Sequence, residues 1–119
     1  MLFTDGTITT LEGRTLYERS FDPATSVKIS QTGEVFWVTR SGLLQSSKRG
    51  ILNGLTSSGV VSFQVNRKSD VAYLSQSGSV GLNGRWVDLT GPRAVAFQLE
   101  TNETQVSVID SDGRIRVYR

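Results

Sequence analysis

The chain has 119 residues, of which 37% are hydrophobic and 20% charged, and its formal net charge is +2. This balance fits one folded domain and excludes a disordered tail, and apolar runs of only a few residues exclude a membrane-spanning helix. The chain has neither cysteine nor histidine, which excludes disulfides, thiolate nucleophiles and the usual zinc ligands.

The N-terminal segment predicts a hairpin followed by two short strands. It opens on Met-Leu-Phe-Thr-Asp-Gly at residues 1–6, without the basic and apolar regions of a secretory signal. We therefore expect a cytoplasmic location, or a virion-associated one if an assembly carries the chain outside. Residues 7–21 resemble the third and outer strands of a repeat that the rest of the chain contains.

A repeat of about 36 residues runs through the chain. Four hairpin glycines, which provide the positive φ that tight turns need, are spaced 36, 36 and 35 residues apart: Gly6, Gly42, Gly78 and Gly113. Apolar residues alternate with period two around each of them, as in strands. One unit therefore predicts an inner strand, a middle strand, a third strand and an outer strand, at Val60–Asn66, Asp70–Gln76, Ser79–Gly84 and Arg85–Leu89.

The middle strand is apolar on both faces in the first two complete repeats. Val35 and Trp37 occupy one face of the first copy, and Phe36 and Val38 occupy the other. A sheet with one wet face would alternate apolar and polar residues instead. Two dry faces are typical of small sheets that stack face to face, as propeller blades do.

The segment from Gly84 through Trp86 and Pro92 to Gly113 and Tyr118 resembles the repeats of tectonin and tachylectin β-propellers. The likeness lies in a tryptophan-bearing outer strand, a small turn, an inner and a middle strand, and a Gly-x-Ile third strand. It covers most of the chain loosely, because Arg14 and Gly50 stand in two other copies of the repeat where this segment has Trp86. The resemblance implies a blade-based binding scaffold, often one for glycans.

The predicted fold is all-β, with three four-stranded propeller blades in one domain and a β-trefoil as the alternative. The blades span approximately residues 26–59, 60–92 and 93–119, and the last is completed by residues 1–25 of the same chain or of a neighbour. Three blades are fewer than a propeller normally has. We therefore expect a homo-oligomer, most simply a dimer with six blades.

Seven residues are candidates for recognition. Trp86 is a tryptophan that the repeat does not require, so together with Asn83 and Arg85 it forms a candidate ligand site, although it could equally cover the edge of its blade. Tyr118, at the end of a strand, is a candidate interface residue if the C-terminal strand is exchanged. The other candidate interface residues are Ile115, Val117 and Leu16.

The sequence carries no motif of catalysis or of metal binding. Asp110-x-Asp112-Gly113 resembles the start of a calcium loop, but the later acidic ligand is missing, so we interpret it as a turn. The eleven acidic residues show no spacing that selects a catalytic pair. Lysine and arginine are spread along the chain, unlike a nucleic-acid footprint. We expect no enzyme activity, no cofactor, no metal, and neither a membrane nor a nucleic-acid partner.

Two functions remain open from the sequence. One is a lectin-like module that recognises a glycan or a protein surface through loops at the blade ends. The other is a structural assembly subunit, for example of a phage particle, that acts through self-association and strand exchange. The expected partners are accordingly a second copy of the chain and a glycan or partner protein.

Overall fold

The computed structural model describes residues 6–10, 12–18, 21–53, 59–87 and 92–119, all of them as β-structure and turns. The start of the first predicted hairpin at residues 1–5 and the end of the predicted outer strand at Asp88–Leu89 lie outside the described residues. The strands are β1 (Ile8–Thr9), β2 (Thr15–Tyr17), β3 (Ala24–Ile29), β4 (Val35–Thr39), β5 (Leu44–Ser46), β6 (Gly50–Ile51), β7 (Val60–Val65), β8 (Val71–Ser75), β9 (Val80–Leu82), β10 (Arg85–Trp86), β11 (Ala94–Leu99), β12 (Val106–Asp110) and β13 (Ile115–Tyr118).

These strands form four small antiparallel sheets. We call β1–β2 the N-terminal hairpin, β3–β6 the first sheet, β7–β10 the second sheet and β11–β13 the third sheet. Within each sheet every strand pairs with its neighbours in sequence, as short turns between antiparallel strands allow. The all-β prediction is confirmed, and the four strands of the second sheet lie within the predicted inner, middle, third and outer segments.

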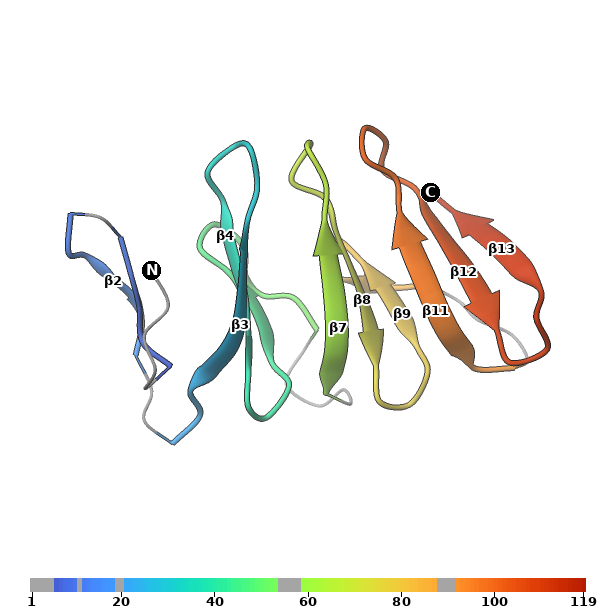
Figure 1. The fold of residues 1–119 in the computed structure, drawn as a ribbon, viewed down its shortest axis with the longest axis horizontal. Coiled ribbons are helices and arrows are strands. Elements are labelled where there is room, and N and C mark those ends of the chain that lie inside the picture. The colour runs from blue at the N-terminus through green and yellow to red at the C-terminus, as the bar shows by residue number, and fades with distance from the viewer. Residues whose placement is uncertain (1–5, 11, 19–20, 54–58, 88–91) are drawn as a thin grey trace.

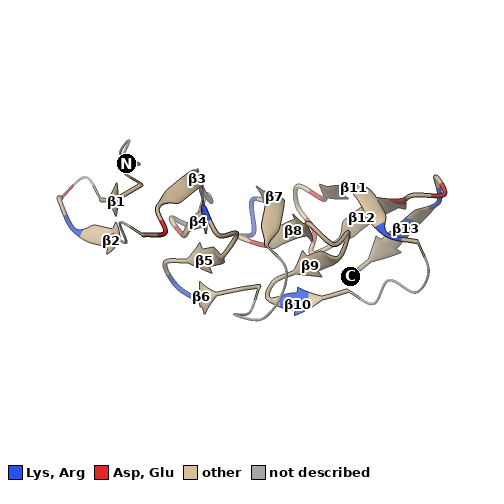
Figure 2. Ribbon diagram, turned by 90° about the horizontal axis from the view of Figure 1, so that it is seen from below, with Lys and Arg blue, Asp and Glu red and all other residues tan. Residues whose placement is uncertain are grey.

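The sheets stand side by side in a row that follows chain order (Figure 1). The molecule measures 46 × 30 × 19 Å, and the inner strands β3, β7 and β11 line one side of the row while β6 and β10 lie along the other (Figure 2). Basic and acidic segments occur along the whole row without gathering at one place (Figure 2). The described sheets close neither into a ring nor into a barrel.

The N-terminal hairpin and the third sheet lie at opposite ends of the row (Figure 1). The hairpin is a separate two-stranded sheet, and β13 pairs with β12 and with no other described strand. In this arrangement the described N-terminal hairpin lies at the end of the row away from the third sheet and does not pair with it. That residues 1–25 complete a third sheet, in their own chain or in a neighbour, stays a prediction.

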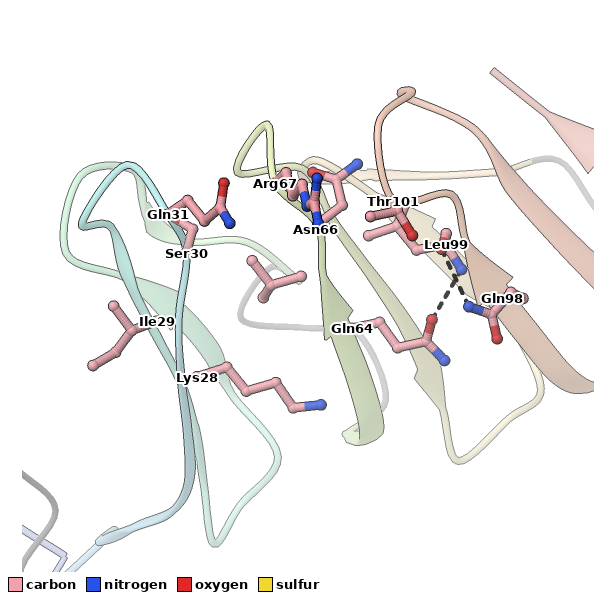
Figure 3. A pocket seen from close by; sticks show the side chains of 11 residues that line it. Lys28, Ile29, Ser30, Gln31, Gln64, Asn66, Arg67, Gln98, Leu99 and Thr101 are labelled. Carbon is pink, nitrogen blue, oxygen red and sulfur yellow. Dashed lines mark hydrogen bonds between the residues drawn. The ribbon is translucent and has the colours of Figure 1, made fainter.

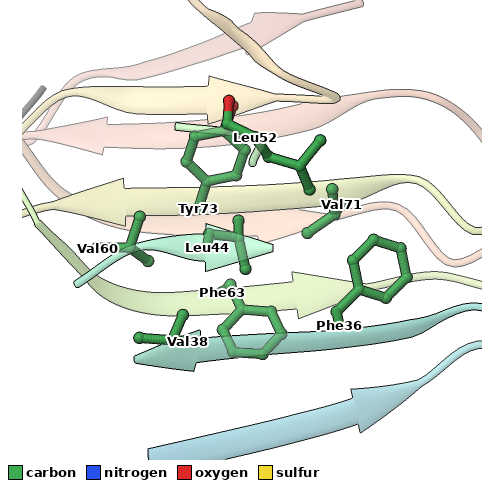
Figure 4. Packing of buried hydrophobic residues seen from close by; sticks show 8 residues of the cluster. All are labelled: Phe36, Val38, Leu44, Leu52, Val60, Phe63, Val71 and Tyr73. Atoms are coloured by element: carbon green, nitrogen blue, oxygen red, sulfur yellow. The ribbon is translucent and has the colours of Figure 1, made fainter. Parts of the chain in front are cut away.

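The core consists of layers between neighbouring sheets. We call the face of a sheet that is turned toward the next sheet in sequence its forward face, and the opposite face its rear face. The layer between the first and second sheets buries eight residues (Figure 4), four from each sheet: Phe36, Val38, Leu44, Leu52, Val60, Phe63, Val71 and Tyr73. Burial of apolar side chains of this size stabilises a fold by roughly 1.5–3 kcal/mol each.

The same arrangement recurs on both sides of this layer. Trp37 and Ala24, on the rear face of the first sheet, pack against Ile8 and Tyr17 of the N-terminal hairpin. Ala72 and Val80, on the forward face of the second sheet, pack against Val106 and Val108 of the third sheet, with Leu74 partly buried beside them. The prediction that the middle strands are dry on both faces is confirmed for β4 and β8, because each contributes residues to two layers.

Among the described residues no helix has the length and apolar character that crossing a membrane would require.

Candidate interaction surface

The forward face of the third sheet, which is the face turned away from the second sheet, is apolar and exposed. Ile115 is 69% exposed, and Ile109 and Val117 beside it are also exposed. The strand register aligns Ile115 with Leu44 in the first sheet and Val80 in the second, and both of those are 0% exposed because the next sheet covers them. The third sheet thus presents a face of the kind that elsewhere in this chain lies against another sheet.

The hairpin glycines also distinguish the covered junctions within the chain from the uncovered third sheet. At each internal junction the N–H of the first inner-strand residue donates to the carbonyl of the preceding hairpin glycine: Ala24 to Gly6 (3.1 Å), Val60 to Gly42 (2.9 Å) and Ala94 to Gly78 (2.9 Å). A Cβ atom on any of these glycines would meet the next unit within 2.5 Å, whereas a Cβ on Gly113 would meet no described atom within 4 Å. Gly113 is the fourth member of this series, and its junction is open.

The four predicted interface residues lie in three different places. Ile115 and Val117 lie on the open forward face of the third sheet. Tyr118 points the other way, because side chains alternate along a strand, and it packs against the layer between the second and third sheets. Leu16 packs against the layer between the N-terminal hairpin and the first sheet. Their role in an oligomer stays a prediction.

A second surface surrounds Trp86. Its indole is 37% exposed and meets the ring of Tyr73 edge-on, with a centroid distance of 5.3 Å. Tyr73 is fixed in turn, because its hydroxyl donates to the Leu52 carbonyl at 3.2 Å and its ring lies over Gly81. A groove of about 310 Å³ adjoins the indole and is lined by Leu82, Arg85, Trp86, Val87, Tyr118 and Arg119.

The structure gives Trp86 a different equivalent from the one predicted. Trp86 pairs with Gly81 in the second sheet, and Ile51 pairs with Gln45, which is the residue equivalent to Gly81 in the first sheet. Ile51, not Gly50, is therefore the counterpart of Trp86. The repeat places an exposed apolar side chain at this point in both complete sheets, and the two interpretations of Trp86, as a ligand residue and as a cover for the sheet edge, both stay predictions.

Asn83, the third residue of the predicted ligand site, is committed to the fold. Its φ of 54° places it in the left-handed region, where asparagine is tolerated best after glycine. Its side-chain oxygen accepts from the Val71 N–H at 3.0 Å and from Arg49 at 3.1 Å, and its amide donates to Asp70 at 2.9 Å. Of the predicted ligand residues, the structure brings Arg85 and Trp86 to the groove and uses Asn83 to build the turn.

Two buried carboxylates join the sheets through polar contacts. Glu34 accepts hydrogen bonds from Arg49 (2.9 Å), Ser46 and Ser69. Burial raises the pKa of Glu34, but these hydrogen bonds and the Arg49 charge outweigh it, so the pKa lies below its usual value. A carboxylate with this many donors is held ionised. Because Ser69 lies in the second sheet's β7–β8 turn, Glu34 connects the first and second sheets.

Asp70 plays the matching part between the second and third sheets. It accepts from Asn66 at 3.0 Å, from Asn83 at 2.9 Å and from Thr104 at 2.8 Å. Burial raises its pKa, and the hydrogen bonds from these three side chains more than compensate, so the net pKa is lowered. Thr104 lies between β11 and β12, 34 residues further along the chain, which sequence spacing alone does not connect to Asp70.

A shallow polar hollow that was not predicted from the sequence lies over the inner strands (Figure 3). Its volume is about 370 Å³. It is lined by Lys28, Gln64 and Gln98, which occupy the same position of the three inner strands. A polar residue recurring inside an apolar strand is the signal that could have revealed it. Gln64 donates to the Phe97 carbonyl at 3.2 Å and accepts from the Leu99 N–H at 2.9 Å, so its amide joins two inner strands.

The described residues contain no group of three or more acidic, histidine or cysteine side chains arranged to hold a metal ion. Comparison with protein families, with curated proteins and with solved structures finds no match to this chain. The functional conclusion therefore depends on the surfaces of this structure alone.

Proposed function

We propose that this chain is a non-enzymatic interaction module that works as a homo-oligomer, with the forward face of the third sheet as its contact surface. The single observation that carries the proposal is the exposure of Ile115 at a position where Leu44 and Val80 are fully buried. Contiguous exposed apolar surface is uncommon on monomeric proteins and marks sites of association. In such an oligomer the sheets would be blades of a propeller that a second copy completes, with a dimer as the simplest form.

The free edge of β13 supports the same proposal. The first and second sheets each have a fourth strand beside the third one, but the described part of the third sheet ends at β13. An unpaired strand edge offers backbone N–H and C=O groups to another chain. An apolar face next to an open edge is suited to receiving a β-structure.

Replacing Ile115 with aspartate tests this proposal. We expect the unaltered chain to show the mass of two copies in sedimentation velocity at micromolar concentration, and Ile115→Asp to show the mass of one, because a charge buried in an apolar contact is strongly unfavourable. Val61 is a matched control, since it is exposed on β7, away from this face. Val61→Asp should leave the mass unchanged. A monomeric unaltered chain, or an Ile115→Asp chain that still associates, would contradict the proposal.

Recognition of a glycan is a second candidate function, favoured by the partly exposed Trp86 indole beside Arg85 in the groove. The negative face of an aromatic ring attracts polarised C–H groups, and an arginine supplies hydrogen-bond donors. On a glycan array we expect any binding to be lost in Trp86→Ala and kept in Ile51→Ala, which alters the equivalent residue of the first sheet. Binding that survives Trp86→Ala, or no binding at all, would count against this function.

A further inference from the structure

The chain carries two versions of one hairpin, at the two ends of the row of sheets. Residues 5–8 read Asp-Gly-Thr-Ile and residues 112–115 read Asp-Gly-Arg-Ile, whereas the two internal hairpins have serine before the glycine. The strand that follows each hairpin has the same place in the repeat, since Ile8 and Ile115 both align with Leu44. The two terminal hairpins therefore match each other in sequence and in their place in the repeat.

The N-terminal version is seated on the rear face of the first sheet. Ile8 is buried there with Tyr17, Ala24 and Trp37. The Gly6 carbonyl accepts from Ala24, and a Cβ atom on Gly6 would lie 2.2 Å from Pro23 Cβ. The Tyr17 hydroxyl donates to the Asp22 carbonyl at 2.6 Å. The rear face of the first sheet is thus a receptor for an Asp-Gly-x-Ile hairpin.

This receptor is only partly covered by the N-terminal hairpin. Ile29, at its inner-strand end, is 67% exposed, although its counterpart Leu99 in the third sheet is 4% exposed under the second sheet. The Trp37 indole nitrogen is buried without a hydrogen-bond partner among the described residues. The described N-terminal hairpin supplies only the third and outer strands, so no inner or middle strand among the described residues covers the rest of the receptor. The third sheet has an inner, a middle and a third strand, which is the set needed to cover it.

We propose that the third sheet of one copy docks on the rear face of the first sheet of a second copy, in the place held by that copy's own N-terminal hairpin. Gly113 and Ile115 then take the positions of Gly6 and Ile8. This docking rests on the proposed self-association. It adds the surface that receives the third sheet and the N-terminal hairpin as the element that regulates access to that surface. Because the two surfaces differ, the contact is head-to-tail, and each copy gives its third sheet and receives another.

Competition with the N-terminal hairpin makes this contact self-limiting. The apparent affinity is the intrinsic affinity multiplied by the fraction of molecules whose receptor is open. A firmly seated hairpin keeps that fraction small, and loosening the hairpin raises it. Association should therefore become tighter when the contacts that hold the N-terminal hairpin on its own chain are weakened. Removing an apolar contact usually weakens association instead.

The test is a set of substitutions in the full-length chain, measured by sedimentation velocity over a range of concentrations. Ile8→Asp places a charge against Trp37 and should release the hairpin, lowering the dissociation constant about tenfold or more. Tyr17→Phe, which removes one hydrogen bond and adds no charge, should lower it about threefold. The double variant Ile8→Asp/Ile115→Asp should be monomeric, which separates specific docking from aggregation of an exposed Trp37 surface. Circular dichroism checks that each variant is folded.

Three outcomes would overturn the exchange. If neither Ile8→Asp nor Tyr17→Phe tightens association although Ile115→Asp abolishes it, the proposed function stands and the partner surface is wrong. If the double variant still associates, the surface that the hairpin releases binds to itself. If neither the unaltered chain nor any variant associates, the proposed function fails as well. If Ile8→Asp does not fold, the threefold effect of Tyr17→Phe decides.

Discussion

Replacing Leu44 with alanine is expected to lower the free energy of unfolding by about 2–5 kcal/mol, the usual cost of truncating a buried leucine. Leu44 is 0% exposed and lies between the first and second sheets with Phe36 and Tyr73 (Figure 4). Its removal would leave a cavity that two paired sheets cannot easily collapse into. Urea-induced unfolding followed by circular dichroism measures the change.

Ile115→Ala is the matched control, because Ile115 has the same position in the third sheet and is 69% exposed. In the monomer its truncation should change stability by no more than about 0.5 kcal/mol, as for ordinary surface substitutions. The unfolding must be measured at a concentration below that of association, since self-association stabilises the folded state by mass action. At higher concentration Ile115→Ala should weaken association. A large loss of monomer stability would show that the third sheet is already covered within the chain.

The order of strands was predictable from the sequence because two periods coincide in it. Alternation of apolar residues locates each strand, and the recurring glycines locate each hairpin. The two-sided burial of β4 was also predictable, since Trp37 and Val38 point to opposite faces of a strand and neither tolerates water well. Strand order and strand burial are both set by local spacing, and local spacing can be read directly from a sequence.

The sequence-based alignment of Trp86 with Gly50 was wrong because the turns before the two outer strands differ in length. Asn83 and Gly84 both have positive φ and form a two-residue connection between Leu82 and Arg85, as asparagine followed by glycine commonly does in a type I′ hairpin. The first sheet instead uses three residues between Ser46 and Gly50. Counting 36 residues across this difference shifts the outer strand by one position. The Asn-Gly pair was the signal that could have corrected the alignment.

The polar junctions could not be predicted, because their members come from different units of the repeat. Asp70 meets Thr104, and Asn66 donates to the Glu100 carbonyl at 2.9 Å. No local spacing encodes such contacts, which depend on how far one sheet is turned against the next. Ile115 and Val117 were candidate interface residues from the sequence, but only the structure shows that the positions equivalent to Ile115 are fully buried in the other two sheets.

Replacing Gly42 with alanine is expected to cost about 2–5 kcal/mol, from two separate sources. Its φ of 91° is strained for any residue with a Cβ atom, at about 1–2 kcal/mol. The new Cβ would also lie 2.5 Å from the Gly59 Cα, and forcing backbone segments apart in a packed junction costs roughly 1–3 kcal/mol more. Thermal and urea unfolding of the variant measure the sum.

Gly113→Ala separates these two sources. Its φ of 82° carries a similar conformational strain, but its Cβ would meet no described atom within 4 Å, so the monomer should lose only about 1–2 kcal/mol. If the third sheet docks on Pro23 and Ala24 of another copy, the same methyl group would strike that copy as it would strike Pro23 from Gly6. Gly113→Ala should then prevent association while leaving a folded monomer. A Gly113→Ala chain that associates normally would show that this junction does not repeat between copies, because no hairpin glycine seated on a following unit has room for a side chain.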